Sequence, residues 1–587
     1  MPQAEAFGEH LAGETIMSSA YQLFMKVNET CKVLCVPSRL SEDDVANFVS
    51  RIDDQYHAHW IVDNLPAAAV GISVDGLPLY SQGFPVGGQL LDTQEYFINN
   101  HVQITILYHE SEEYNGARVV GFQVLPLSVN HNVHPETLPK DEAGNPKLED
   151  VTLPGCNAAS GIGVQESANL PMQIIFGDRA GQSTFVTYSY DVFWVPSDLK
   201  WASRWDIYLS NGARFSPMIH WVNIFNSIAI VALLTAMVAL ILVRALYRDI
   251  SRYNRVATDE ERAEDREETG WKLVHGDVFR PPSKNPVLFA VTIGTGSQLA
   301  AMVLATTIFS AVGFLNPSNR GSLMSALVVT FMLLGVLGGY VAARVHKMFD
   351  GKSWQRTTIW TALLIPGVLF TVLFTLNLFV WSEHSVNAVP FVSMLGVLGL
   401  WLLVSVPLVF GGAYLGFKAD AVELPKKVRG VPRQIPPQPW YLTDFATAAL
   451  GGLLPFGTLY VELLFILGSI WQDMYYYVFG FLLIVVVLAA IASAEISIVL
   501  TYFSLCSEDY QWWWRSWRIP AATGVYVFLY SIYYFSTSLS MHGFVPTLLY
   551  FGYMGIISCA IGLTLGVVGY HSTFEFVRRI YEAVKTE

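Results

Sequence analysis

The chain has 587 residues, of which 52% are hydrophobic and only 14% are charged, and its mean hydropathy is +0.39. A soluble protein of this length is rarely so apolar, so the composition favours a membrane protein. The charge is uneven, because residues 1–220 hold 26 acidic and 11 basic side chains, whereas the remainder holds 22 and 24. Such an acidic first part would be repelled by nucleic acid and by anionic lipid surfaces, which argues against nucleic-acid binding.

Residues 1–220 read as a folded, β-rich head, because strand-like stretches alternate with turns and no apolar run is long enough to cross a bilayer. The stretches HVQITILYH (101–109) and FVTYSYDVFW (185–194) alternate apolar and polar residues, which predicts two half-buried strands. One helix is expected after Ser41, which can cap it together with Asp44.

The head also carries cysteines and one glycosylation motif. Cys31 and Cys35 are close enough in sequence for a bridge in an oxidising lumen, and Cys156 is the only other cysteine before the membrane. Asn28-Glu29-Thr30 is the only N-glycosylation sequon of the chain, so Asn28 is a candidate glycosylation site.

Nine apolar runs of about 20 residues or more follow the head, and each is long enough to cross the roughly 30 Å core of a bilayer as a helix. They lie near residues 222–243, 287–313, 322–343, 357–381, 389–415, 446–470, 476–504, 520–538 and 545–574.

The basic residues predict how these helices are oriented, because Lys and Arg are retained on the cytosolic side of a membrane. One set of connections, with the C-terminal end, holds 23 basic residues, whereas the opposite set holds only Arg320. The head is therefore expected to be lumenal or extracellular, and the C-terminus cytosolic. We predict an α+β membrane protein with a β-sandwich-like lumenal domain over residues 1–220, a nine-helix transmembrane bundle over 221–577 and a cytosolic tail over 578–587.

Two carboxylates fall within predicted membrane helices. An unpaired ion at such depth costs on the order of 3 kcal/mol, so Glu462 and Glu495 must be neutral, paired or in a wet cavity. They are candidates for a polar site that binds cargo helices or ions, or for hydrogen-bonded structural residues. An alternative function is therefore a transporter or channel that uses these intramembrane carboxylates.

Glycine pairs at four-residue spacing suit close helix packing, either within the bundle or against another protein's membrane helix. These are Gly335 with Gly339, Gly412 with Gly416, and Gly562 with Gly566.

Nothing in the sequence favours an enzyme. Phosphate-cradling loops of the Gly-Lys-Ser/Thr type, H-E-x-x-H and G-x-S-x-G do not occur, and no histidines or cysteines stand at a convincing metal-ligand spacing. We expect no catalytic residue, no metal and no cofactor.

Several long motifs resemble the nonaspanins, the nine-transmembrane superfamily (EMP70-like). The resemblance runs nearly from end to end. It is carried by GWKLVHGDVFRPP (270–282), PRQIPPQPWY (432–441), LLPFGTLYVELLFILGSIW (453–471) and the stretch 476–517, which ends in CSEDYQWWWRSW, and within the head by VDNLPAA (62–68) and GFPVGG (83–88).

The resemblance implies residence in Golgi and endosomal membranes and a role in sorting membrane proteins or delivering them to the surface. Its implied partners are transmembrane cargo proteins, with glycine-rich helices among them, and coatomer. Lys585 and Glu587 match the family's Lys-x-Asp/Glu tail, which is similar to a coatomer-binding retrieval signal. Family members usually begin with a signal peptide and a further lumenal stretch, which implies that the N-terminus is incomplete.

Overall fold

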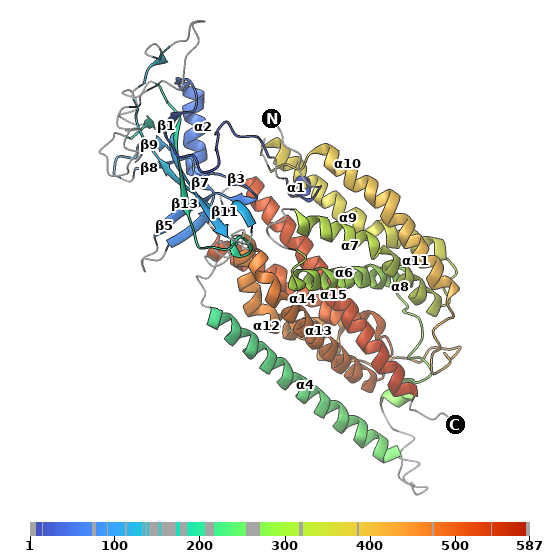
Figure 1. Cartoon of the computed structure of the whole chain (residues 1–587). Coiled ribbons are helices and arrows are strands. Elements are labelled where there is room, and N and C mark those ends of the chain that lie inside the picture. Colours follow the sequence, from blue (N-terminus) through green and yellow to red (C-terminus); the bar gives the residue numbers. More distant parts are fainter. Residues whose placement is uncertain are drawn as a thin grey trace, which may run out of the picture. The chain divides into compact units, whose positions relative to one another are not determined.

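The computed structural model describes residues 7–13, 16–72, 78–90, 92–111, 114–131, 133–135, 138–139, 151, 153, 172–176, 185–205, 217–253, 270–315, 321–383, 385, 387–471, 475–539, 541 and 543–582. The chain forms two compact units. One, the head, is built around Met17–Phe215; the other, the helical unit, is built around residues 216–587 together with the short helix α1 (Phe7–Ala12) (Figure 1).

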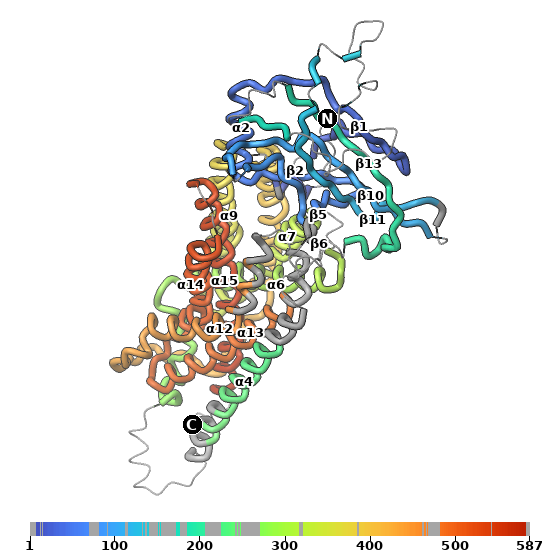
Figure 2. The backbone as a smooth tube through the Cα atoms, turned by 90° about the vertical axis from the view of Figure 1, so that its left-hand side faces the viewer, coloured from blue at the N-terminus to red at the C-terminus, as the bar shows by residue number. Residues whose placement is uncertain are grey.

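The head is organised around a mixed six-stranded sheet with the order β1-β13-β10-β11-β5-β6. Its strands are β1 (Glu29–Val33), β5 (Ala68–Ile72), β6 (Pro78–Gln82), β10 (His101–Ser111), β11 (Tyr114–Leu127) and β13 (Ser189–Pro196). The β13–β10 and β11–β5 pairs are parallel, and the other pairs are antiparallel. Figure 2 shows β1, β13, β10 and β11 lying side by side.

One face of this sheet forms the main core of the head. Val102, Ile104 and Ile106 of β10 are buried there, as expected from their alternation, and they pack with Phe122 and Val124 of β11. Such alternation places every second side chain on the same face of a strand. The strand prediction for residues 101–109 is therefore confirmed, and that for 185–194 is confirmed over β13.

Smaller sheets and one helix complete the described part of the head. A three-stranded sheet has the order β12 (Ile174–Phe176), β9 (Tyr96–Ile98) and β8 (Gly87–Gln89). Two short pairs join β2 (His57–Ala58) to β7 (Phe84–Pro85) and β3 (Ile61–Val62) to β4 (Leu65–Pro66). Helix α2 (Glu42–Asp53) begins at Ser41 with the expected capping box to Asp44. The N-terminal region is thus rich in sheet, as predicted.

Helices occur at each of the nine places where the sequence predicts a membrane span, within the described residues. They are α4 (Pro217–Tyr253), α6 (Pro286–Val312), α7 (Ser322–Leu333) with α8 (Gly335–Met348), α9 (Trp354–Ser382), α10 (Phe391–Leu400) with the π-helical η7 (Trp401–Ser405) and α11 (Val406–Lys418), α12 (Asp444–Trp471), α13 (Tyr475–Cys506), α14 (Trp513–Ser538) and α15 (Phe544–Glu582).

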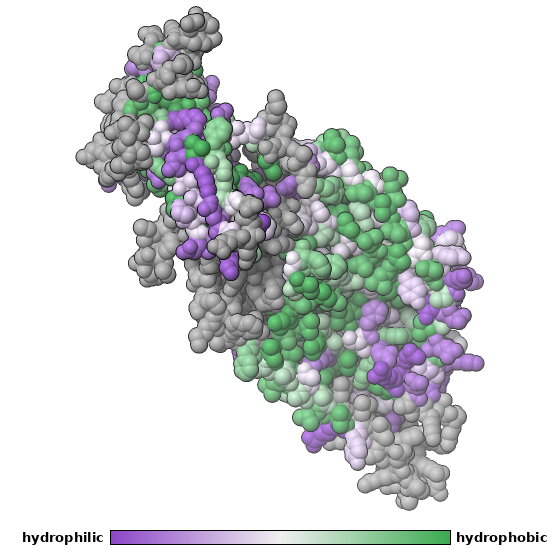
Figure 3. Space-filling view, viewed as in Figure 1, coloured by the Kyte–Doolittle hydropathy of each residue, from purple (hydrophilic) through white to green (hydrophobic). Residues whose placement is uncertain are grey.

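Six of these segments, among the described residues, are long and apolar enough to cross a membrane: α6, α7–α8, α9, α10–α11, α13 and α15. Hydrophobic side chains form a broad band over the helical unit, and hydrophilic side chains gather toward its lower end (Figure 3). The chain is therefore a multi-pass membrane protein. The count of nine spans, which also needs α4, α12 and α14, stays a prediction.

Candidate functional site

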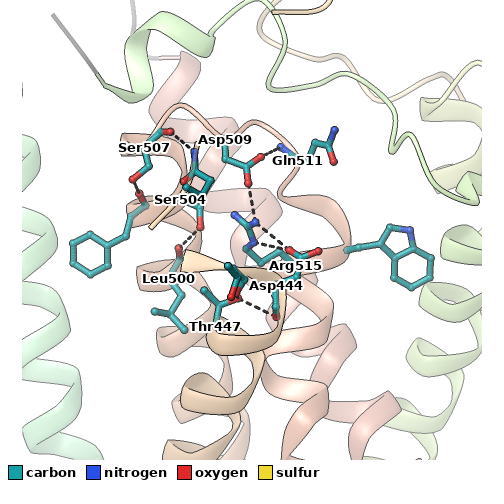
Figure 4. Close-up of polar contacts among 12 residues, drawn as sticks. Asp444, Thr447, Leu500, Ser504, Ser507, Asp509, Gln511 and Arg515 are labelled. Carbon is teal, nitrogen blue, oxygen red and sulfur yellow. Dashed lines mark hydrogen bonds and ion pairs between the residues drawn. The ribbon is translucent and has the colours of Figure 1, made fainter. Parts of the chain in front are cut away.

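A buried arginine holds together the end of the bundle at which α12 and α14 begin (Figure 4). Arg515 lies in the first turn of α14 and is only 5% exposed. Its Nη2 atom lies 2.7 Å from Asp509 Oδ2 and 3.0 Å from Asp444 Oδ1. Arg518, one turn later, donates from Nη2 to the second oxygen of Asp444 at 2.8 Å. We call Asp444, Asp509, Arg515 and Arg518 the arginine cluster.

The electrostatics of this cluster suit its position. Asp444 is the first residue of α12, where a carboxylate interacts favourably with the helix dipole. Burial raises the pKa of Asp444, but the guanidinium groups of Arg518 and Arg515 outweigh burial, and the pKa is lowered. Asp444 is therefore a carboxylate at neutral pH, and it joins α12 to α14.

Three consecutive tryptophans fix the segment before α6 to the same end of the bundle. The indole N–H groups of Trp512, Trp513 and Trp514 donate to the carbonyls of Val278, Arg280 and Lys284, each at 2.8 Å. These contacts span more than 220 residues of sequence. We call Trp512, Trp513 and Trp514 the tryptophan clamp.

The largest hydrophobic core of the molecule's described residues surrounds this clamp. It joins the segment around Trp271 to the last turns of α15 around Tyr581, whose hydroxyl donates to the Trp271 carbonyl at 2.7 Å. Phe289 of α6 is also fully buried in it. The motif GWKLVHGDVFRPP thus forms a packed cap on the helices.

The glycine pairs pack inside the bundle. A side-chain carbon on Gly412 would lie 2.0 Å from the Val336 carbonyl oxygen, and one on Gly339 would lie 2.1 Å from that of Val409. Helices α8 and α11 therefore approach through both of their glycine pairs. On α15, Gly562 faces the carbonyl oxygen of Ala521 of α14, and Gly566 faces the indole ring of Trp517. The sequence left open a role against another protein's helix; these glycines are used internally.

A groove on α9 offers a different surface. It has a volume of about 560 Å³ and is lined by Ile359, Trp360, Leu363, Leu364, Gly367, Val368, Thr371 and Val372. The groove flanks a proline, Pro366, which lacks the N–H that would bond the carbonyl of Ala362. The Trp401 indole N–H of η7 donates to that carbonyl at 3.1 Å, so η7 supplies the missing hydrogen bond, and the Trp401 ring borders the groove at Gly367.

Of the two predicted intramembrane carboxylates, the structure describes the side chain of Glu495 but not that of Glu462. Glu495 lies on α13 and is half-buried, and its Oε2 atom is buried without a hydrogen-bond partner among the described residues. Glu462 lies on α12, and its side chain falls outside the described part of the structure. Lys585 and Glu587 also lie outside it, because the description of the C-terminal end stops at Glu582.

The cysteine expectation needs a correction. Cys31 is disulfide-bonded, but Cys35 is a free thiol, so the Cys31–Cys35 bridge is wrong. Cys31 sits at a β-bulge of β1 and has φ +59°. The remaining cysteine of the head, Cys156, lies outside the described residues.

Asn28 lies just ahead of β1 and is exposed, as a glycosylation site requires. Its Oδ1 atom accepts a hydrogen bond from the Trp194 N–H at 2.8 Å. The geometry fits an acceptor asparagine, and modification of Asn28 stays a prediction.

Sequence reasoning missed the arginine cluster and the tryptophan clamp as sites. From the sequence, Arg515 and Arg518 are predicted only to be two of the 23 basic residues on the cytosolic side. The available signal was Trp512-Trp513-Trp514 beside two arginines and Asp509, at the boundary of an apolar run. Among the described residues, no group of three or more His, Cys, Asp or Glu side chains could hold a metal ion.

Comparison with known proteins places the chain in a family. Residues 1–544 match the family described as endomembrane protein 70. The chain is 41% identical to transmembrane 9 superfamily member 10 of Arabidopsis thaliana, over 100% of this chain and 89% of the relative. It is 37% identical to transmembrane 9 superfamily member 4 of Homo sapiens, over 100% and 89%.

A third relative, named putative phagocytic receptor 1a, from Dictyostelium discoideum, is 39% identical over 99% of this chain and 88% of its own length. No solved structure matches the chain. The matches run through the head, the tryptophan clamp and the helices alike, so this chain belongs to the endomembrane protein 70 family, the transmembrane 9 superfamily.

Proposed function

We propose that this protein is a trafficking factor of the Golgi and endosomal system, which binds transmembrane cargo and aids its sorting or surface delivery. In this proposal nine helices cross the membrane, the head is lumenal, and Lys585 with Glu587 forms a cytosolic retrieval signal read by coatomer. The name of one relative, a putative phagocytic receptor, is consistent with a role in handling surface proteins.

The observation that carries the proposal is the groove on α9. Helix α9 is a candidate membrane span with 22% of its apolar window buried, so most of that window is open to contact. Gly367 lies 13 residues after the first residue of the helix, which is roughly 20 Å along it and near mid-depth of the span. A helix seated there would be in hydrocarbon, where only packing and hydrogen bonds hold helices together.

The lining of the groove suits a helix rich in small residues. Gly367 and Thr371 are the two small residues of the lining and stand four positions apart, on one face of α9. Small residues at this spacing let two backbones approach closely and gain dispersion contacts. The glycine pairs of α8, α11 and α15 are packed against backbone or side chains of the bundle, whereas Gly367 of α9 meets only the edge of the Trp401 ring, 3.4 Å from where its side-chain carbon would lie, so α9 is the surface that we assign to cargo.

Groove-filling substitutions test this assignment. We expect Thr371→Trp to lower co-purification of a membrane protein with a glycine-rich helix by about tenfold, which corresponds to roughly 1.4 kcal/mol. Leu403→Trp is the matched control, because Leu403 is exposed at 79% on η7, outside the groove. Equal capture by both variants would contradict the cargo site on α9.

The retrieval signal needs a separate test. Deleting Lys585–Glu587 should shift the steady-state distribution from the Golgi toward later compartments and the cell surface, and should abolish coatomer capture by the purified tail. Cargo capture in detergent should be unchanged by the deletion. A distribution that does not move would remove the signal from the proposal while leaving the groove intact.

A second candidate function rests on the Oε2 atom of Glu495, which is buried without a hydrogen-bond partner in the described part of the chain. A carboxylate held in this way inside a membrane helix is typical of ion or proton pathways. Flux through reconstituted vesicles that is abolished by Glu495→Gln would favour transport. Flux that is absent, or indifferent to this substitution, would leave the sorting function alone.

A further inference from the structure

The head contains a buried cluster of ionisable side chains that the proposed function does not use. His101 and Asp191 are 0% and 0% exposed, Ser189 is 0% exposed and His131 is 1% exposed. We call His101, His131, Ser189 and Asp191 the histidine cluster. Buried polar networks of this kind are costly unless every member is satisfied, so they are informative about function.

The cluster joins three segments of the head, which are β10, β13 and the residues after β11. His101 opens β10 and lies beside Ser189 of β13 in the parallel register. His101 Nδ1 and His131 Nε2 each lie 2.8 Å from the Ser189 hydroxyl oxygen, so one hydroxyl serves two imidazoles. The other ring nitrogen of His101 lies 3.3 Å from Asp191 Oδ2.

The cluster contacts the edge strand β1, which also pairs with β13 through its backbone. The N–H of Cys31 donates to Asp191 Oδ1 at 2.6 Å. Cys31 lies in the bulge between the paired positions Glu29 and Lys32, and its φ is +59°. Asp191 thus accepts a hydrogen bond that a regular strand would have given to the neighbouring backbone.

The cluster also holds the segment that follows β11. His131 reaches Ser189 from this segment, and two residues earlier Val129 is pinned by Asn100, which accepts from the Val129 N–H at 2.9 Å and donates to its carbonyl at 2.7 Å. His131 Nδ1 is buried without a hydrogen-bond partner among the described residues. Among the described residues, His131 therefore has no acceptor for a second ring proton.

Charge balance makes this arrangement sensitive to acid. The titratable groups that act on His131 are His101 of β10, whose positive charge opposes that of His131, and Asp191 of β13, which favours it. On β1, Lys32 and Glu29 pair with each other 2.9 Å apart. The rings of His101 and His131 have centroids 6.2 Å apart. Among the described residues, two imidazolium ions at this distance would share the one carboxylate of Asp191, and the uncompensated buried charge would oppose the closed structure.

We propose that the histidine cluster is an acid-sensitive latch, which holds β1 and residues 129–131 on the six-stranded sheet at neutral pH and releases both in an acidic compartment. Release would free the edge of the sheet at β13 and the disulfide-bonded Cys31 together. This inference goes beyond the sorting function, because it concerns the head alone and does not depend on cargo. A lumenal head would meet such a pH change between early and late compartments.

The direction follows from linkage. Burial lowers the pKa of His131 to about 4, with His101 adding to the effect and Asp191 opposing it, whereas an exposed histidine titrates near 6.5. The closed form therefore binds fewer protons than the open form between these two values. The free energy by which this pKa difference favours the closed form is complete above about pH 6.5 and is lost as the pH falls toward 4. At about pH 5 the opening equilibrium should have risen roughly 30-fold.

Hydrogen exchange of the full-length protein in nanodiscs tests the latch. Exchange is followed at pH 7.2 and 5.0 and corrected for the intrinsic pH dependence with an unfolded reference. We expect peptides covering β1 and residues 128–135 to lose protection by roughly 30-fold at the acidic pH, while the β10–β11 hairpin stays protected. This measurement needs no variant, and unchanged protection of β1 would overturn the proposal.

Two substitutions test whether His131 causes the loss of protection of β1 at acidic pH. His131→Gln removes the titrating group and should leave β1 protection independent of pH between these values. His134→Gln is the matched control, because His134 lies three residues later and is exposed. Acid-induced release that persists in His131→Gln, or that vanishes in His134→Gln, would contradict the latch.

Discussion

Arg515 is a buried cation, and two carboxylates, those of Asp444 and Asp509, balance its charge. Arg515→Met would leave Asp509 buried without its partner, which costs on the order of 3–5 kcal/mol for a broken buried pair. We therefore expect a large fall in the thermal unfolding midpoint of the detergent-purified protein. Arg518→Met is the control, because the Arg518 side chain is 40% exposed and its pair should contribute about 1 kcal/mol or less.

The comparison of the two arginines is decisive because they share Asp444. Equal midpoints for the two variants would mean that burial of Arg515 does not matter and that the cluster is only a surface network. The sequence could not separate these residues. Asp444 lies 71 positions from Arg515, and only the packing of α12 against α14 decides which arginine is enclosed.

At the scale of elements, the close approach of α8 and α11 makes a sharp test of glycine packing. Gly412→Ala places a methyl group where the Val336 carbonyl oxygen already lies, so the helices must separate, at a cost of about 1–3 kcal/mol. Gly411→Ala, one position earlier, meets nothing within 4 Å and should be neutral or slightly stabilising, since alanine favours helix by about 1 kcal/mol. Unfolding midpoints of both variants check this, and a stable Gly412→Ala would contradict internal packing.

Elements differ in how far their sequences determine them. Long apolar runs placed a helix at all nine expected positions within the described residues, because hydropathy and length act locally. The break between α7 and α8 and the π-helical turn at Trp401–Ser405 were not predicted. Trp401 bonds a carbonyl that Pro366 frees on another helix, so that irregular turn forms a tertiary contact. Likewise, the alternation of apolar and polar residues predicts the strands β10 and β13. Their parallel pairing joins residues almost 90 positions apart, so a local pattern does not predict it.

For the whole molecule, the number of spans fixes the sides on which its ends lie. Six spans, the number of described helices that are long and apolar enough, would put the head and the C-terminal end on the same side of the membrane, whereas nine would put them on opposite sides. Residues 519–538 of α14 carry no charge, and 20 helical residues extend about 30 Å, which is enough to cross the hydrocarbon core. The single charge of α12 after Asp444 is Glu462. Both helices can therefore span, as the nine-helix count requires.

Sealed Golgi-derived vesicles distinguish the two counts. With nine spans, external protease should remove an epitope placed after Glu587 while the head stays intact, because 23 basic residues hold that set of connections in the cytosol and Arg320 alone opposes them. The protected head should carry a glycan, detected as a mobility shift that glycosidase removes and that Asn28→Gln abolishes. Detergent is the control, since it must expose both ends to the protease. A head and an epitope that are protected together would require an even number of spans. In that case α4, α12 or α14 would lie outside the bilayer, and the retrieval signal could not reach coatomer.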